Sequence, residues 1–254
     1  MFLEPNETPY DLHWRMFGTP VRVHPMFWLV NIVLGWDAAM RPGGGGFPIL
    51  VLWVACVFVS IVVHEFGHVL VGRLFGTHGY IVLYGMGGLA IGSNQLPRRW
   101  QRIAVSFAGP FAEFVLLAIF MVAFIFLGPY LPPRWDPYVE TVIAFMVWIN
   151  LFWGLVNLLP IWPLDGGQIA REICQAAMPQ RGTAFSLGIS MVVSGVLAVH
   201  MLMASHGRPL IPIRYLNFGD MFLAFFFAMF CVSSFLALQA ENERRRHWDH
   251  DEWT

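Results

Sequence analysis

The stretch from residue 47 to about residue 75 is almost wholly apolar, yet it contains His64-Glu65-Phe66-Gly67-His68. About 20 mostly apolar residues suffice for a helix to cross a membrane, and this stretch exceeds that length. Ionisable groups inside a bilayer are costly, and they usually serve a function there. The titratable residues of this motif are therefore candidates for a functional site at membrane depth.

The rest of the chain is also suited to a membrane. The 254 residues are 57% hydrophobic and only 12% charged, whereas ordinary globular domains carry about 25% charged residues. No apolar core long enough for a cleavable signal is visible at the N-terminus. We predict an all-α membrane protein with about six transmembrane helices, at roughly residues 21–40, 47–75, 103–127, 139–161, 183–203 and 216–238.

A glycine-rich segment, residues 79–92, separates the second and third apolar stretches. It is too short for a spanning helix. Tyr80–Tyr84 has the composition of a β-strand, and Gly87-Gly88 could form the turn of a hairpin. We therefore predict a short β-hairpin or re-entrant segment beside the second helix, covered by protein or a water-filled cavity.

The charges predict an orientation. The net charge is −1 and no long basic run is present, so nucleic acid is not an expected partner. With six helices both termini share one side, and the opposite side holds only Arg41, Arg134, Arg208 and Arg214 among 15 basic residues. The positive-inside rule then makes the termini cytoplasmic. We expect one multi-pass domain of the cell membrane, residues 1–254, with a core at about 20–178 and C-terminal helices and a polar tail at 183–254.

His64 and His68 have the spacing of two metal ligands on a helix. Residues four apart lie on one helical face, so both imidazoles can bind the same ion. Glu65 would lie beside that ion, where it could deprotonate a bound water. Residues 47–63 rise about 25 Å before the motif begins, which predicts a site nearer the cytoplasmic face. The competing interpretation is that the three side chains satisfy one another in a helix bundle.

A catalytic zinc ion needs a third protein ligand and an open position. Asp165 is the best candidate, because it follows the fourth apolar stretch, which runs toward the cytoplasm as the second does. Pro160 and Pro163 break the helix before it, and Gly166-Gly167 permits a sharp turn after it. The alternative is that Asp165 is only a turn or helix N-cap residue.

Glu113 is the rival third ligand. It lies early in the third apolar stretch and also starts near the cytoplasmic face. It could instead hydrogen-bond a metal-bound histidine and fix its tautomer.

Two motifs together resemble the site-2 protease family of intramembrane zinc metalloproteases. The first is HEFGH in a membrane helix, and the second is Asn-x-x-Pro-x-x-x-x-Asp-Gly, about a hundred residues later. Residues 22–28 are similar to the bacterial branch that processes sporulation factors, and Ala108-Gly109-Pro110 resembles another family segment. The positions that match the second motif are Asn157, Pro160, Asp165 and Gly166.

The resemblance implies a role for each matching residue. His64, His68 and Asp165 would hold one Zn²⁺ per chain, and Glu65 would be the catalytic base. Asn157 would help to hold the substrate strand, and the stretch with Gly87 and Gly88 would be the membrane-associated β segment. The chain departs from the family at Glu113, where asparagine is common.

The leading hypothesis is regulated intramembrane proteolysis of a single-pass membrane protein in the lipid bilayer. The substrate helix must unwind locally, and an edge strand near Tyr80–Tyr84 could pair with it. One alternative is a zinc-stabilised membrane scaffold that binds helical partners without cleaving them. Another is an ion transporter, with Glu65, Glu113 and Asp165 along its pathway.

Overall fold

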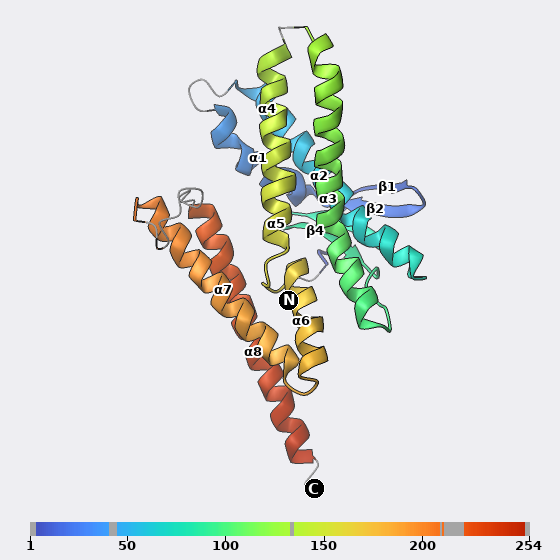
Figure 1. Ribbon diagram of the computed structural model, residues 1–254, viewed down its shortest axis with the longest axis vertical. Helices are drawn as coiled ribbons and strands as arrows, with labels where there is room; N and C mark the ends of the chain where they lie inside the picture. The colour runs from blue at the N-terminus through green and yellow to red at the C-terminus, as the bar shows by residue number, and fades with distance from the viewer. Residues whose placement is uncertain (1–3, 41–44, 133–134, 209, 211–220, 252–254) are drawn as a thin grey trace. The chain divides into compact units, whose positions relative to one another are not determined.

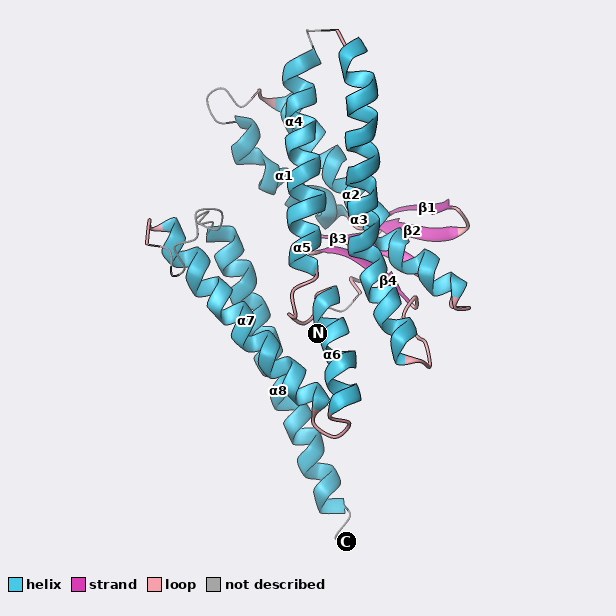
Figure 2. Ribbon diagram, viewed as in Figure 1, coloured by secondary structure: helices cyan, strands magenta, loops and turns pink. Residues whose placement is uncertain are grey.

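The computed structural model describes residues 4–40, 45–132, 135–208, 210 and 221–251 (Figure 1). It separates into two units, one that extends to Asn157 and one that begins at Leu158. Helices dominate both units, and the strands found in the described residues belong to the first (Figure 2).

The first unit is built on α2 (Phe47–Leu74) and α3 (Arg99–Leu127), which pack against each other. Proline in the first turn of α2 costs no hydrogen bond, because the N–H groups of that turn have no partner within the helix. Both helices agree with the predicted second and third spans. The other helical segments of this unit are α1 (Pro25–Met40), the 3₁₀ turn Gly128–Tyr130, α4 (Asp136–Val147), the π-helical turn Trp148–Trp153 and α5 (Gly154–Asn157).

A four-stranded mixed sheet lies beside α2 in this unit. Its order is β1-β2-β3-β4, and β2 and β3 run parallel, so the N-terminal residues join a segment some sixty positions further on. The outer pairs are antiparallel. The strands are β1 (Leu12–Met16), β2 (Thr19–Val23), β3 (Tyr80–Tyr84) and β4 (Gly87–Ile91).

The predicted hairpin is confirmed, but two details of the prediction are wrong. The turn consists of Gly85 and Met86, while Gly87 and Gly88 are the first residues of β4. Tyr80–Tyr84 is an interior strand, because β2 and β4 flank it, and the two edges of the sheet are β1 and β4. This pairing has no local sequence signal, because β2, the strand that covers β3, comes before the first apolar helix.

The beginning of the first predicted span is also wrong. Residues 19–23 form β2, and the helix begins only at Pro25, a residue suited to the first helical position. Val21 and Val23 are buried by the sheet instead of by lipid. The apolar part of α1 is therefore shorter than expected, at Pro25–Trp36.

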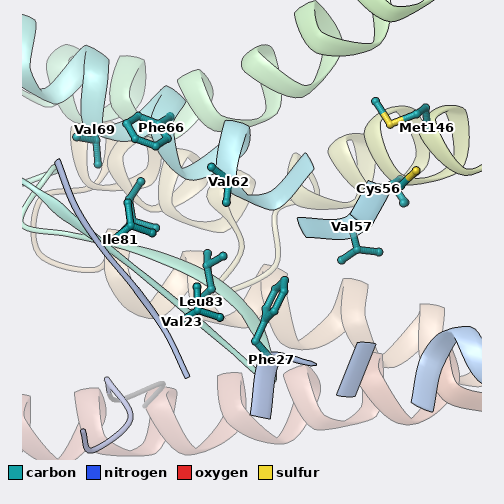
Figure 3. Packing of buried hydrophobic residues seen from close by; sticks show 12 residues of the cluster. Val23, Phe27, Cys56, Val57, Val62, Phe66, Val69, Ile81, Leu83 and Met146 are labelled. Carbon is teal, nitrogen blue, oxygen red and sulfur yellow. The ribbon is translucent and has the colours of Figure 1, made fainter. Parts of the chain in front are cut away.

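The core of the first unit lies between α2 and the sheet. Val62, Phe66 and Val69 of α2 have the spacing of one helical face, and their side chains lie with Ile81 and Leu83 of β3 (Figure 3). All five side chains are buried. One face of the helix that carries the HEFGH motif is therefore fixed by apolar packing.

The described residues of the second unit form three helices. α6 (Asp165–Ala177) follows the proline-rich loop, and α7 (Gly182–Ser205) packs closely against α8 (Met221–Asp251) (Figure 1). The predicted polar tail at the end of the chain belongs to α8, which continues as far as Asp251. The predicted start of the sixth span, residues 216–220, and the loop at residues 41–44 lie outside the described residues.

Five helices among the described residues are long and apolar enough to cross a membrane, and α1 contributes a shorter apolar helix. The fourth predicted span combines α4, the π-helical turn and α5. A π-helical turn within an α-helix often marks a functional region. In this chain it packs against α2, the helix that carries His64 and His68.

Candidate metal centre

His64 and His68 project from the same face of α2, as their spacing predicts. The two Nε2 atoms are 3.1 Å apart, and both side chains are buried. Glu65, between them in sequence, is buried as well. Three titratable side chains are thus enclosed in the C-terminal half of a largely apolar helix.

The second nitrogen of each imidazole faces an oxygen on α3. Nδ1 of His68 is 2.6 Å from the backbone oxygen of Val105, and Nδ1 of His64 is 3.2 Å from Oε2 of Glu113. Glu113 is only 1% exposed. Both oxygens favour the tautomer that carries its proton on Nδ1, because a carbonyl or carboxylate can only accept that hydrogen.

This pattern makes the pair suitable for a metal ion. With the proton of each ring on Nδ1, each Nε2 has a lone pair, and two lone pairs 3.1 Å apart repel each other. A cation shared by both Nε2 atoms removes that repulsion. Neutral imidazole with its other nitrogen bonded to a carbonyl or carboxylate is a typical zinc ligand.

Two glycines allow α2 and α3 to approach each other at this point. A Cβ atom on Gly109 of α3 would overlap the imidazoles of both His68 and His64. A Cβ atom on Gly67 of α2 would overlap the backbone oxygen of Ala108. Small residues at such crossings are typical of membrane helices. Here Gly109 is also required by the site, because a larger residue would displace the imidazoles.

β4 approaches the motif from the sheet side. A Cβ atom on Gly88 would overlap the side chain of Glu65, so only glycine leaves that carboxylate its present position. Tyr84, at the end of β3, is nearby: its burial and, to a smaller extent, the charge of Glu65 together raise the pKa of its hydroxyl to about 12. The edge strand therefore lies against the candidate catalytic base.

The π-helical turn and α5 complete the polar surroundings of the histidines. Asn150 donates hydrogen bonds to Oγ of Ser60, one helical turn before His64, and to the backbone oxygen of Met146. A Cβ atom on Gly154 would lie 3.0 Å from Oε2 of Glu113. The carboxylate of Glu113 thus occupies a fitted space between His64 and α5.

Asp165 belongs to the second unit. It is the first residue of α6, and its side chain is 8% exposed. Leu164 is the N-cap, so the alternative that made Asp165 the cap is wrong. Asn157 ends α5 in the first unit and is partly buried.

Val105, whose backbone oxygen faces His68, is not predicted from the sequence, because a carbonyl acceptor has no sequence signature. Gly109 is recognisable in the sequence only as part of a family segment. A glycine directly before a proline inside an apolar helix is the signal that could have revealed a close approach at Gly109.

Comparisons with known proteins identify the family of this chain. The family model described as Peptidase family M50 matches residues 52–133 and 133–201. A Synechocystis protein assigned as zinc metalloprotease sll0528 is 32% identical over 62% of this chain and 42% of its own length. A Mycobacterium tuberculosis protein assigned as zinc metalloprotease Rip3 is 32% identical over 75% of this chain and 49% of its own length. The chain spans about half the length of these relatives.

A solved structure supports the same conclusion at the level of the fold. The site-2 protease from Methanocaldococcus jannaschii matches with a TM-score of 0.55 and 23% identity, over 87% of this chain and 94% of that chain. The family match covers both the HEFGH motif and the segment with Asp165, and the apolar helices make the chain a multi-pass membrane protein. The chain belongs to the site-2 protease family of metallopeptidases, peptidase family M50.

Proposed function

We propose that this chain is an intramembrane zinc metalloprotease that hydrolyses peptide bonds within or near transmembrane segments of membrane-anchored proteins. One observation carries the proposal: two buried Nε2 atoms are 3.1 Å apart, and the Nδ1 atom of each ring faces an oxygen. That arrangement suits a cation, and Glu65 lies next in sequence to the first histidine. Membership of a metallopeptidase family supports the same assignment.

His64, His68 and Asp165 are the proposed protein ligands of one Zn²⁺ per chain. Burial of all three side chains supports this set, as does the match of Asp165 to the Asn-x-x-Pro-x-x-x-x-Asp-Gly motif. Glu113 is assigned the other role, that of holding His64. Its Oε2 atom faces Nδ1 of His64, on the opposite side of the ring from Nε2.

Glu65 is the proposed general base and acid. Zn²⁺, when bound, supplies a Lewis acid and lowers the pKa of a water molecule to about 7. Glu65 accepts a proton from the attacking water and returns it to the leaving amine. Glu65 is buried, and a Cβ atom at position 88 would overlap its side chain, so Gly88 leaves room for this carboxylate beside β4.

The proposed substrate is a single-pass membrane protein whose helix unwinds locally, since helical carbonyls are occupied by hydrogen bonds. The edge strand β4 is the proposed partner of the unwound segment, in place of Tyr80–Tyr84, because the outer edge of β4 can form further backbone hydrogen bonds. Gly87 and Gly88 would keep this edge free of side chains next to Glu65, and Asn157 would hold the substrate strand. The proposal includes that this cleavage is regulated, as in regulated intramembrane proteolysis.

The proposed location is the cell membrane. Both termini would be cytoplasmic, and the active site would lie nearer the cytoplasmic face. The excess of arginines on the side of the termini supports this orientation. The whole chain, residues 1–254, acts as one protease domain in this proposal.

Cleavage can be tested in liposomes that contain the full chain and a panel of single-pass membrane proteins. Mass spectrometry would identify new termini produced by the wild type and by Glu65→Gln. We expect products only from the wild type, while zinc measured by mass spectrometry is equal in both proteins. Products formed at the same rate by Glu65→Gln would contradict the mechanism. Bound zinc without products from either protein would favour the scaffold alternative.

A further inference from the structure

The loop before Asp165 has an unusual set of backbone partners. Pro160 and Pro163 have no N–H group. The N–H of Ile161 bonds the oxygen of Leu159 at 2.7 Å, and the N–H of Leu164 bonds the oxygen of Ile161 at 2.8 Å. The N–H of Trp162 instead bonds a side chain of a different helix.

That side chain is Ser190 of α7. The N–H of Trp162 donates to Oγ of Ser190 at 2.7 Å, and Oγ of Ser190 is 2.7 Å from Oγ of Ser234 on α8. The hydroxyl of Ser234 donates to the backbone oxygen of Trp162 at 3.5 Å. The donors and acceptors form a closed ring when Ser190 donates to Ser234, so that each hydroxyl donates once and accepts once.

Neither serine behaves as a usual serine of a membrane helix. Such serines generally bond a carbonyl of their own helix. Ser194, one turn after Ser190, does so: its hydroxyl donates to the oxygen of Ser190 at 2.6 Å. Ser190 and Ser234 are both buried, with 1% and 0% exposure, and their hydroxyls are directed to the loop. Non-helical backbone at membrane depth requires such partners.

The loop and the start of α6 are packed as one piece. A Cβ atom on Gly166 would overlap the backbone oxygen of Leu158, and one on Gly167 would overlap the backbone of Ile161. Asp165 therefore has little freedom to move independently of the loop. A displacement of Trp162 must displace the carboxylate that begins α6.

We propose that Ser190 and Ser234 form a clamp on the backbone of Trp162 that positions Asp165 as a metal ligand. This inference rests on the proposed role of Asp165. In this proposal α7 and α8 contribute to the active site, because they supply the hydroxyls that hold the loop before Asp165. Ser190 and Ser234 are positioning residues, because they act on the metal only through the loop.

The clamp can be tested in the full-length protein with Ser190→Ala, Ser234→Ala and the matched control Ser194→Ala, which removes an equally buried hydroxyl from α7. Amide hydrogen exchange of Trp162 reports the loop, and titration with Zn²⁺ reports the site. We expect Trp162 to exchange about 5–10-fold faster in the first two variants and zinc to bind about tenfold more weakly. Both quantities should stay at wild-type values in Ser194→Ala.

A spectroscopic measurement separates positioning from general loosening of the fold. With Co²⁺ in place of Zn²⁺, the visible absorption spectrum should differ from that of the wild type in Ser190→Ala and Ser234→Ala. Ser234→Thr keeps the hydroxyl and should have the spectrum of the wild type. Unchanged exchange at Trp162 overturns the clamp. Faster exchange with unchanged zinc affinity and cobalt spectrum overturns the positioning role. If Asp165→Asn binds zinc as the wild type does, the proposed ligand set fails, whatever the exchange at Trp162 shows.

Discussion

The two units place their candidate ligands by different means. In the first unit, His64 and His68 stand on a long regular helix, and the helical repeat places both imidazoles on one face, where their Nε2 atoms are 3.1 Å apart. In the second, Asp165 follows a loop with two prolines, and hydroxyls from α7 and α8 hold the backbone of that loop. A helix carries its geometry in local spacing, whereas a loop depends on residues distant in sequence.

The largest expected effects come from removing one ligand from each unit. His68→Ala and Asp165→Ala should each weaken zinc binding by more than about 100-fold, because each removes a direct metal contact. Zinc content after dialysis at a fixed free zinc concentration measures this. Comparable losses of zinc affinity would mean that the site needs both the histidine on the helix and the aspartate that follows the loop. Wild-type zinc in Asp165→Ala would make the site a property of the first unit alone.

Glycine substitutions test whether zinc binding depends on close packing at the histidines of the first unit, in comparison with an open position in the second unit. Gly109→Ala should weaken zinc binding about tenfold or more, because its Cβ atom would displace the imidazoles of His64 and His68. The matched control is Gly188→Ala in α7, where no atom lies within 4 Å of the added carbon. It should leave zinc binding unchanged and raise helix stability by up to about 1 kcal/mol. An unaffected zinc affinity in Gly109→Ala would mean that the histidines can shift without leaving the metal.

Glu113 tests whether the helix alone is sufficient to orient His64. Glu113→Gln should weaken zinc binding about tenfold, because an amide can present its NH₂ group to Nδ1 and favour the wrong tautomer. Glu140→Gln, on the exposed surface of α4, is the control and should have no effect. Titrations with Zn²⁺ at constant pH compare the two variants. A loss of more than 100-fold in Glu113→Gln would indicate a direct ligand and would reverse the roles assigned to Glu113 and Asp165.

The same contrast explains what the sequence could predict. The HEFGH helix, the third span and the strand Tyr80–Tyr84 are local patterns, and the structure contains each of them. The pairing of β2 with β3 is not local, and it turned the expected edge strand into an interior one. Ser190 and Ser234 could not be recognised either, because a serine in an apolar helix gives no indication of whether it bonds its own helix or a distant loop.

The smallest effect concerns the N-terminal segment that covers the sheet beside α2. Tyr80 on β3 donates a hydrogen bond to Oε2 of Glu4 at 2.7 Å, and this bond, with burial and the charge of Glu4, raises the pKa of the tyrosine. A pKa raised by folding stabilises the folded state below the unfolded value of about 10, and the contribution is lost as pH rises through the folded-state pKa.

Tyr80→Phe should therefore lower stability by less than about 1 kcal/mol at pH 8, and the difference from the wild type should be smaller at pH 11. Thermal unfolding at both values measures this, with Tyr130→Phe, an exposed tyrosine, as control. An equal difference at both values would mean that the hydroxyl does not act through Glu4. Zinc affinity at pH 8 should be the same in Tyr80→Phe as in the wild type, since the helical repeat places the histidines without help from this segment. A weaker affinity would show that even the regular helix depends on distant contacts, and the contrast between the two units would then be one of degree.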